Sequence, residues 1–252
     1  MDIFNLFDCF CLYGNLTERI LMKTSLKCSL NCDVLYIFAK GNRLTTYSLF
    51  FMLILLDPGH GLNTPGKRSP DGTFLEATYN REIAKRIVAE LQNKGYDAEL
   101  LVPEEEDIPL KERVRRANEH CQIHGKSNVI LISIHVNAAG NGSKWMNATG
   151  WSCYTCKGQT QSDKLADCLY EAAINNFPGR RIRTDYSDKD PDWEENFYLL
   201  RKTLCPAVLS ENYFMDNKSD LEYLQSRAGK QAVIDTHVEG ITEYLNLIQY
   251  IT

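Results

Sequence analysis

The stretch Leu53-Ile-Leu-Leu-Asp-Pro-Gly-His-Gly61 combines four apolar residues with a turn sequence and a histidine. A short apolar run that ends in Asp-Pro-Gly is typical of a buried β-strand that runs into a loop. We therefore expect a core strand at residues 53–56, with the loop that carries His60 directly after it.

Downstream of this strand, strand and helix patterns alternate. Apolar spacing and glycine or proline stops predict helices at 76–94, 110–124, 162–177, 220–224 and 227–247, and further strands at 97–102, 129–135, 150–154 and 207–211. Strands separated by helices indicate a parallel-type sheet that is covered on both faces. We predict an α/β fold: a single three-layer domain with a mostly parallel central sheet flanked by helices. Two long loops, 57–75 and 178–196, interrupt the alternation, and loops of that length tend to be functional.

Residues 1–51 differ from the rest of the chain. They show no sustained period, contain no proline, and do not read as a signal peptide, because Asp2 and Asp8 lie where basic residues would be needed. We expect Met52 to be the natural start, residues 1–51 to be an N-terminal extension outside the catalytic fold, and residues 52–252 to form the catalytic domain. A genuine N-terminal subdomain is the alternative, and only then would Cys9, Cys11, Cys28 and Cys32 be a possible four-thiolate site.

The composition excludes several classes of protein. With 28 basic and 33 acidic residues and a net charge of -5, the 252-residue chain shows no basic run for a nucleic-acid partner. Its longest apolar run, residues 47–56, is shorter than the ~20 residues that a membrane span needs. Nine cysteines at irregular spacing do not form a secreted disulfide framework, so reduced thiols are expected.

Four side chains with catalytic chemistry fall near the carboxyl edge of the predicted sheet, where open α/β sheets bind ligands. His60 follows the first strand, His135 and Glu211 close two others, and Glu76 opens a helix. Two histidines and a glutamate are a ligand set of catalytic zinc, and a carboxylate that is not a ligand can act as general base on a water. The sequence supplies both. The alternatives are hydrogen-bonded structural histidines and, for Glu76, a favourable charge at a helix start.

Five motifs extend this pattern across the chain. In chain order, the motifs are residues 55–61, Glu76 with Asn80, the helix that carries Arg113 and Asn118, residues 133–137 and residues 206–211. Their order and spacing resemble those of the zinc-dependent N-acetylmuramoyl-L-alanine amidases of the family-3 type. The segments 145–158 and 180–195 look particular to a subgroup.

The resemblance implies a phosphorylase/hydrolase-like fold, one zinc per chain with His60, Glu76 and His135 as its ligands, and Glu211 as the catalytic carboxylate. It implies hydrolysis of the amide bond between the lactyl group of N-acetylmuramic acid and L-alanine. Asp57 and Asn137 are candidates to support the ligands or orient substrate, with a turn role as the alternative. For Arg113 and Asn118 we expect packing or helix-to-loop hydrogen bonds.

Two other functions use the same features. A zinc exopeptidase would cut peptide bonds, but many such enzymes hold two metals and need a further bridging carboxylate, for which the sequence offers only Asp57. A catalytically silent peptidoglycan-binding module would lack a ligand or the base. We expect a monomer that acts on peptidoglycan or muropeptides, made in the cytoplasm without a recognisable signal peptide. Release in the manner of a phage or prophage lysis enzyme would explain this, with a recycling or toxin-like role as the alternative.

Overall fold

The computed structural model describes residues 34–38, 44–48 and 52–249, and the chain divides into two units, Met1–Phe51 and Met52–Thr252. In the first unit β1 (Val34–Phe38) pairs antiparallel with β2 (Leu44–Ser48). The four cysteines of the alternative thiolate site lie outside the described residues.

The second unit is built on a six-stranded sheet with the order β4-β3-β5-β8-β6-β7. The strands are β3 (Leu53–Pro58), β4 (Asp97–Leu100), β5 (Val129–Asn137), β6 (Ser152–Thr155), β7 (Trp193–Glu194) and β8 (Ala207–Phe214). The first four strands in this order are mutually parallel, whereas β6 runs antiparallel to β8 and parallel to β7. The expectation of a mostly parallel central sheet is confirmed.

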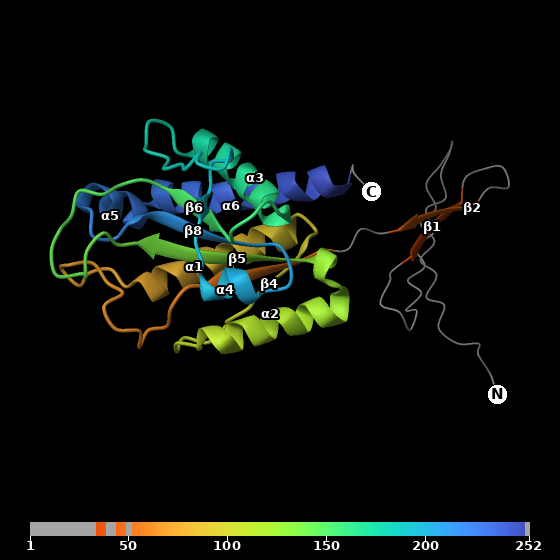
Figure 1. Cartoon of the computed structure of the whole chain (residues 1–252), viewed down its shortest axis with the longest axis horizontal. Coiled ribbons are helices and arrows are strands. Elements are labelled where there is room, and N and C mark those ends of the chain that lie inside the picture. The colour runs from red at the N-terminus through yellow and green to blue at the C-terminus, as the bar shows by residue number, and fades with distance from the viewer. Residues whose placement is uncertain (1–33, 39–43, 49–51, 250–252) are drawn as a thin grey trace, which may run out of the picture. The chain divides into compact units, whose positions relative to one another are not determined.

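Helices cover both faces of this sheet (Figure 1). They are α1 (Glu76–Asn93), α2 (Leu110–His124), a short 3₁₀ turn η1 (Lys126–Asn128), α3 (Gln161–Asn176), α4 (Tyr198–Lys202), α5 (Lys218–Gln225) and α6 (Arg227–Gln249). In the part of the chain that the structure describes, no helix is long and apolar enough to cross a membrane.

The apolar residues of the strands pack in two layers. On one face α2 and α4 pack over the sheet in a cluster that includes Leu53, Leu55, Val114, Ala117, Leu131 and Leu199. Side chains alternate between the faces of a strand, so Ile54, Leu56, Ile130 and Ile132, all fully buried, point to the other face. There α1 contacts β3 and β5, and α6 packs against α1 and α3. The three-layer prediction is therefore confirmed.

The strands that carry the candidate site extend further than their apolar pattern. The pattern predicts ends at His135 and Glu211, but β5 runs to Asn137 and β8 to Phe214, because backbone pairing continues through the polar residues. His135 is the register partner of Glu211, and Asp57 is that of Ser133. The three parallel strands β3, β5 and β8 thus bring the candidate residues to one edge of the sheet.

Candidate metal centre and active site

Three donor side chains from separate elements converge at the carboxyl edge of the sheet. His60 lies in the loop after β3, Glu76 is the first residue of α1, and His135 lies on β5. Glu76 Oε1 is 3.5 Å from His60 Nε2 and 3.2 Å from His135 Nδ1. One ligand atom of each residue lies within 4.8 Å of the others, which is the arrangement of a metal site. The structure thus brings together the three residues that the resemblance marks as ligands.

Two glycines make the close approach of the histidines possible. A Cβ on Gly59 would lie 2.2 Å from His135 Cε1, and a Cβ on Gly61 would lie 2.0 Å from the backbone nitrogen of Asp107. His60 between them has a φ of 62°, in the left-handed region that non-glycine residues rarely adopt. Any side chain at position 59 would have to displace the His135 ring, so the Gly-His-Gly sequence is a packing requirement of the site.

The buried Arg113 side chain holds the loop that carries His60 through hydrogen bonds. The Arg113 guanidinium, 2% exposed, donates to Asp57 Oδ1 at 2.6 Å, to the Pro58 carbonyl at 2.8 Å and to the His60 carbonyl at 3.2 Å. The second oxygen of Asp57 accepts a hydrogen bond from the Ser133 hydroxyl at 2.7 Å. The helix-to-loop role expected for Arg113 is confirmed. The Asp57 carboxylate is occupied by these two partners, which fits a support for the His60 loop.

Hydrogen bonds orient one oxygen of Glu76 and leave the other free. Oε1 accepts from the Val136 backbone N–H at 3.1 Å and from the Asn80 amide at 3.4 Å, and the same amide donates to the Gly59 carbonyl. Oε2 is buried and has no hydrogen-bond partner among the residues that the structure describes. A buried carboxylate oxygen without a partner is costly, and a bound cation beside the two histidines would satisfy it.

The electrostatics of two of the three donors suit a cation, whereas for His135 the opposite effect of burial is outweighed by the hydrogen bond and charge of Glu76, which raise its pKa. Burial lowers the pKa of His60 to about 4, although Glu76 acts in the opposite direction. Burial by itself would raise the pKa of Glu76, but the hydrogen bond and charge of His135 and the charge of His60 hold this pKa below its ordinary value. Glu76 is therefore ionised near neutral pH, while His60 is neutral and keeps a lone pair for a metal.

Glu211 lies beside this group on β8 but is not a member of it. Its Oε2 is buried, and no residue in the described part of the chain makes a hydrogen bond to it. Burial raises the pKa of Glu211 to about 7; His135 opposes this shift, and the charge of Glu76 adds to it. A carboxyl group that titrates near neutral pH can both accept and release a proton, as a general base and acid must.

Residues that flank Glu211 anchor its strand to the core. The Ser210 hydroxyl lies 2.8 Å from His237 Nε2, and His237 Nδ1 lies 2.7 Å from the Val233 carbonyl. Because a carbonyl only accepts, Nδ1 carries the proton and Nε2 accepts from Ser210. On the other side, the Asn212 amide donates to the His135 carbonyl at 2.9 Å and its oxygen accepts from the Trp151 indole. The links of Ser210 to His237 and of Asn212 to His135 and Trp151 were not expected from the sequence, since these partners lie far apart along the chain.

The buried His237 makes the stability of the fold depend on pH. Burial lowers its pKa to about 4, against about 6.5 in an unfolded chain. Its stabilising contribution is therefore complete above pH 6.5 and is lost as the pH falls toward 4. Between pH 7 and pH 5 the wild type should lose about 2 kcal/mol more free energy of unfolding than His237→Gln. Urea unfolding of both proteins without added metal measures this difference, and parallel pH profiles would contradict it.

The remaining predicted residues have backbone partners. Asn137 Oδ1 accepts from the Ala138 N–H at 2.8 Å, and its carbonyl accepts from the Met215 N–H at 2.8 Å. Asn118 bridges the Lys202 carbonyl and the Leu204 N–H, the helix-to-loop contact expected of it. For Asn137 these bonds favour the turn role over contact with substrate.

Comparisons with known proteins agree with this geometry. Residues 54–243 match the family described as N-acetylmuramoyl-L-alanine amidase. The chain is 30% identical to an endolysin of Bacillus phage SPP1 and 28% identical to the N-acetylmuramoyl-L-alanine amidase CwlM of Bacillus licheniformis. Each match covers 77% of this chain, and 66% and 69% of the respective relatives, so the chain spans about two thirds of their length. An N-acetylmuramoyl-L-alanine amidase from Clostridium difficile 630 superimposes with a TM-score of 0.66 at 27% identity, over 79% of this chain and 98% of that one.

Proposed function

The chain belongs to the N-acetylmuramoyl-L-alanine amidase family, and from that premise we propose that it uses a zinc ion to hydrolyse the amide bond between the lactyl group of N-acetylmuramic acid and L-alanine in peptidoglycan. The observation that carries the proposal is the trio of His60, Glu76 and His135, in which the buried glutamate has one oxygen without a partner among the described residues, with Glu211 alongside. The resemblance noted from the sequence motifs is confirmed at the level of the family.

The donor set fits zinc better than other common divalent ions. Two imidazoles and one carboxylate match the ligands of catalytic zinc, whereas calcium and magnesium prefer oxygen ligands alone. We assign His60, Glu76 and His135 as the residues that would hold one ion per chain. When bound, zinc supplies Lewis-acid chemistry, polarising an amide carbonyl and making a water more acidic.

In this proposal Glu211 moves the proton. Its carboxylate accepts a proton from the attacking water as the new carbon–oxygen bond forms at the lactyl carbonyl. The same proton then passes from Glu211 to the leaving nitrogen of L-alanine as the carbon–nitrogen bond breaks. A pKa raised to about 7 by burial suits both halves of this transfer. Arg113 and Asp57 act indirectly, by holding the His60 loop in place.

The alternatives from the sequence are less well supported. A two-metal exopeptidase needs a bridging carboxylate, but both oxygens of Asp57 are taken by Arg113 and Ser133. A silent peptidoglycan-binding module has no need of a buried glutamate whose pKa is raised to about 7 beside a donor trio.

Digestion of purified sacculi separates these functions. The amidase should release stem peptides that begin with L-alanine, which amine labelling and mass spectrometry identify, and a chelator should stop the release until zinc is added back. Cleavage within the stem peptide would support the exopeptidase. Binding to sacculi with no released amine would support the silent module.

For the domain organisation, we propose that residues 52–252 form the catalytic unit and that Met52 is the natural start. A protein that begins at Met52 should keep the thermal midpoint and the sacculus-degrading activity of the full chain, because the buried strand β3 begins at Leu53. Thermal unfolding and turnover of both proteins check this. A truncated protein that is insoluble or much less stable would make residues 1–51 part of the fold.

We also propose that the enzyme is a monomer that degrades cell wall in a lytic setting. The similarity to a phage endolysin supports lysis over recycling.

A further inference from the structure

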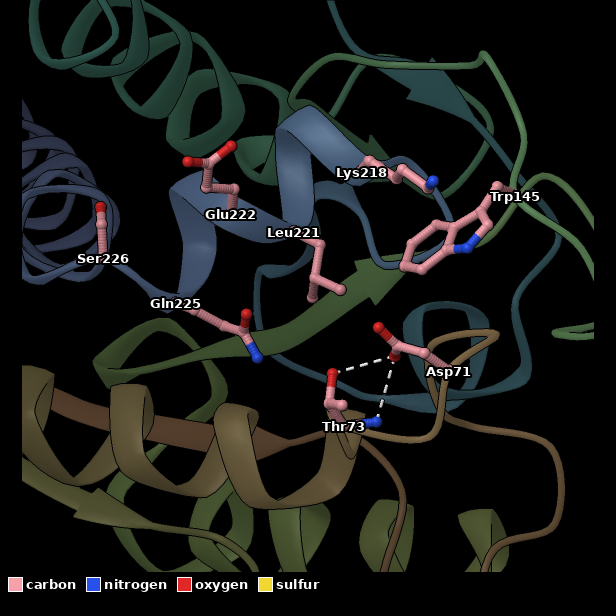
Figure 2. A pocket seen from close by; sticks show the side chains of 8 residues that line it. All are labelled: Asp71, Thr73, Trp145, Lys218, Leu221, Glu222, Gln225 and Ser226. Carbon is pink, nitrogen blue, oxygen red and sulfur yellow. Dashed lines mark hydrogen bonds between the residues drawn. The ribbon is translucent and has the colours of Figure 1, made fainter.

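A cavity with a volume of about 590 Å³ lies outside the metal centre. Figure 2 shows Trp145, Leu221 and Gln225 on one side of it and Asp71 and Thr73 on the other. Its walls come from the 57–75 loop, the segment after β5, and helix α5 with the residue that follows it, and they consist of Asp71, Thr73, Trp145, Lys218, Leu221, Glu222, Gln225 and Ser226.

The cavity is a neighbour of the metal centre. Its three walls follow β3, β5 and β8, the strands whose carboxyl ends carry His60, His135 and Glu211. Thr73 is only three residues before Glu76, so their Cα atoms lie within about 11 Å of each other. This separation is within the reach of a substrate that extends beyond the scissile bond.

The walls are held in position. Asp216 accepts from the Ala139 and Gly140 N–H groups and, through its carbonyl, from the Met146 N–H at 2.7 Å, which ties the segment carrying Trp145 to the end of β8. Thr149 donates to Asp220 of α5 at 2.7 Å. On the opposite wall, Asp71 closes its own turn by accepting from Ser69 and Thr73. The cavity is a built feature of two loops and helix α5, and one of these loops includes the segment 145–158 that looked particular to a subgroup.

The lining favours a neutral polar ligand with an apolar face. It offers one partly exposed indole, with Lys218 Nζ 5.5 Å from the ring centroid, and hydroxyl, amide and carboxylate groups around it. Leu221 is the one aliphatic side chain of the lining, so a purely apolar ligand is not favoured. The lining has two acidic residues and one lysine, so an anionic ligand is not favoured either. Sugars match this set, because their hydroxyl and acetamide groups need hydrogen-bond partners and their C–H faces pack on aromatic rings.

We propose that this cavity is a saccharide subsite for an N-acetylated sugar of the glycan strand, with Trp145 as the ring on which the sugar packs. The inference rests on the proposed amidase function, since it says which part of that substrate is held beside the scissile amide. Gln225 and Thr73 supply hydrogen bonds from opposite walls.

Binding of a tetramer of β-1,4-linked N-acetylglucosamine to the full chain tests the subsite. This probe has no lactyl amide and is not a substrate of the proposed reaction. Removal of the ring in Trp145→Ala should weaken the affinity about tenfold or more, whereas Trp145→Phe should retain most of it. Tyr186→Ala is the matched control, because Tyr186 is a 65% exposed aromatic outside the cavity. Calorimetry gives the affinities, and thermal unfolding shows whether the variants are folded.

Failure of the saccharide subsite and failure of the amidase function give different results in the binding experiment and the sacculus digestion. No binding of the tetramer to the wild type, or equal binding to Trp145→Ala, overturns the subsite while release of L-alanine peptides still supports the amidase. A Trp145-dependent affinity for free stem peptide in place of the sugar also overturns it. Trp145-dependent binding of the tetramer with no release of amine supports the saccharide site and contradicts the amidase.

Discussion

Replacement of His60, Glu76 or His135 by alanine is expected to abolish zinc binding and sacculus degradation together. Each substitution removes one of the three proposed protein ligands. Loss of a residue that merely supports a ligand costs about 10–100-fold in metal affinity, so loss of a ligand itself should cost more. Glu76→Ala also removes the carboxylate that contacts both histidines, at 3.5 Å and 3.2 Å, and should be the most severe of the three. Elemental analysis of zinc and turnover, measured on one purified sample, check the prediction.

The control for these variants is His120→Ala. His120 lies on α2 and pairs with Glu99 at 3.2 Å, away from the three donors. This variant should keep about one zinc per chain and full turnover. A His60→Ala protein that retains both would remove His60 from the metal centre. A stoichiometry near two in the wild type would favour the two-metal exopeptidase.

The sequence predicts the framework of this molecule well, for a physical reason. Leu53–Pro58 and Val129–Asn137 are fully buried strands for most of their length, so their apolar runs are long enough to recognise. The topology of a parallel sheet then forces His60, His135 and Glu211 to one edge, which makes the grouping of the site predictable. By contrast β7 and α4, with two and five residues, are too short to show a period and were not expected.

What the sequence does not predict are contacts between residues far apart in the chain. The sequence marks Asp57 as a candidate to support a ligand or orient substrate, or else as a turn residue, and only the fold shows that it pairs with Arg113, 56 positions away. His237 reads as an ordinary helical residue, yet it is fully buried and accepts from Ser210 beside Glu211. The pattern of one segment carries no information about such a partner. The same holds for the Trp145 cavity, whose walls come from two separate loops and helix α5.

Glu211→Gln is expected to reduce turnover by about 10²–10⁴-fold, the usual range for loss of a general base, while zinc stays bound. Glutamine keeps the shape of the side chain but cannot take a proton from water. The flanking contacts of Ser210 with His237 and of Asn212 with the His135 carbonyl do not involve the substituted group, so β8 and the donors should stay in place. Removal of the Glu211 carboxyl, whose pKa burial raises to about 7, should also spare stability.

The decisive measurement is zinc content together with turnover on the same sample of Glu211→Gln. The control is Glu171→Gln, an equivalent change at an exposed position of α3, which should keep both. A general base and a ligand give different results, because a base can be lost without losing the ion. Retained zinc with collapsed turnover places Glu211 in proton transfer, whereas loss of zinc from Glu211→Gln would make it a ligand. Near-normal turnover would exclude it from the reaction, and the proton would then need another acceptor.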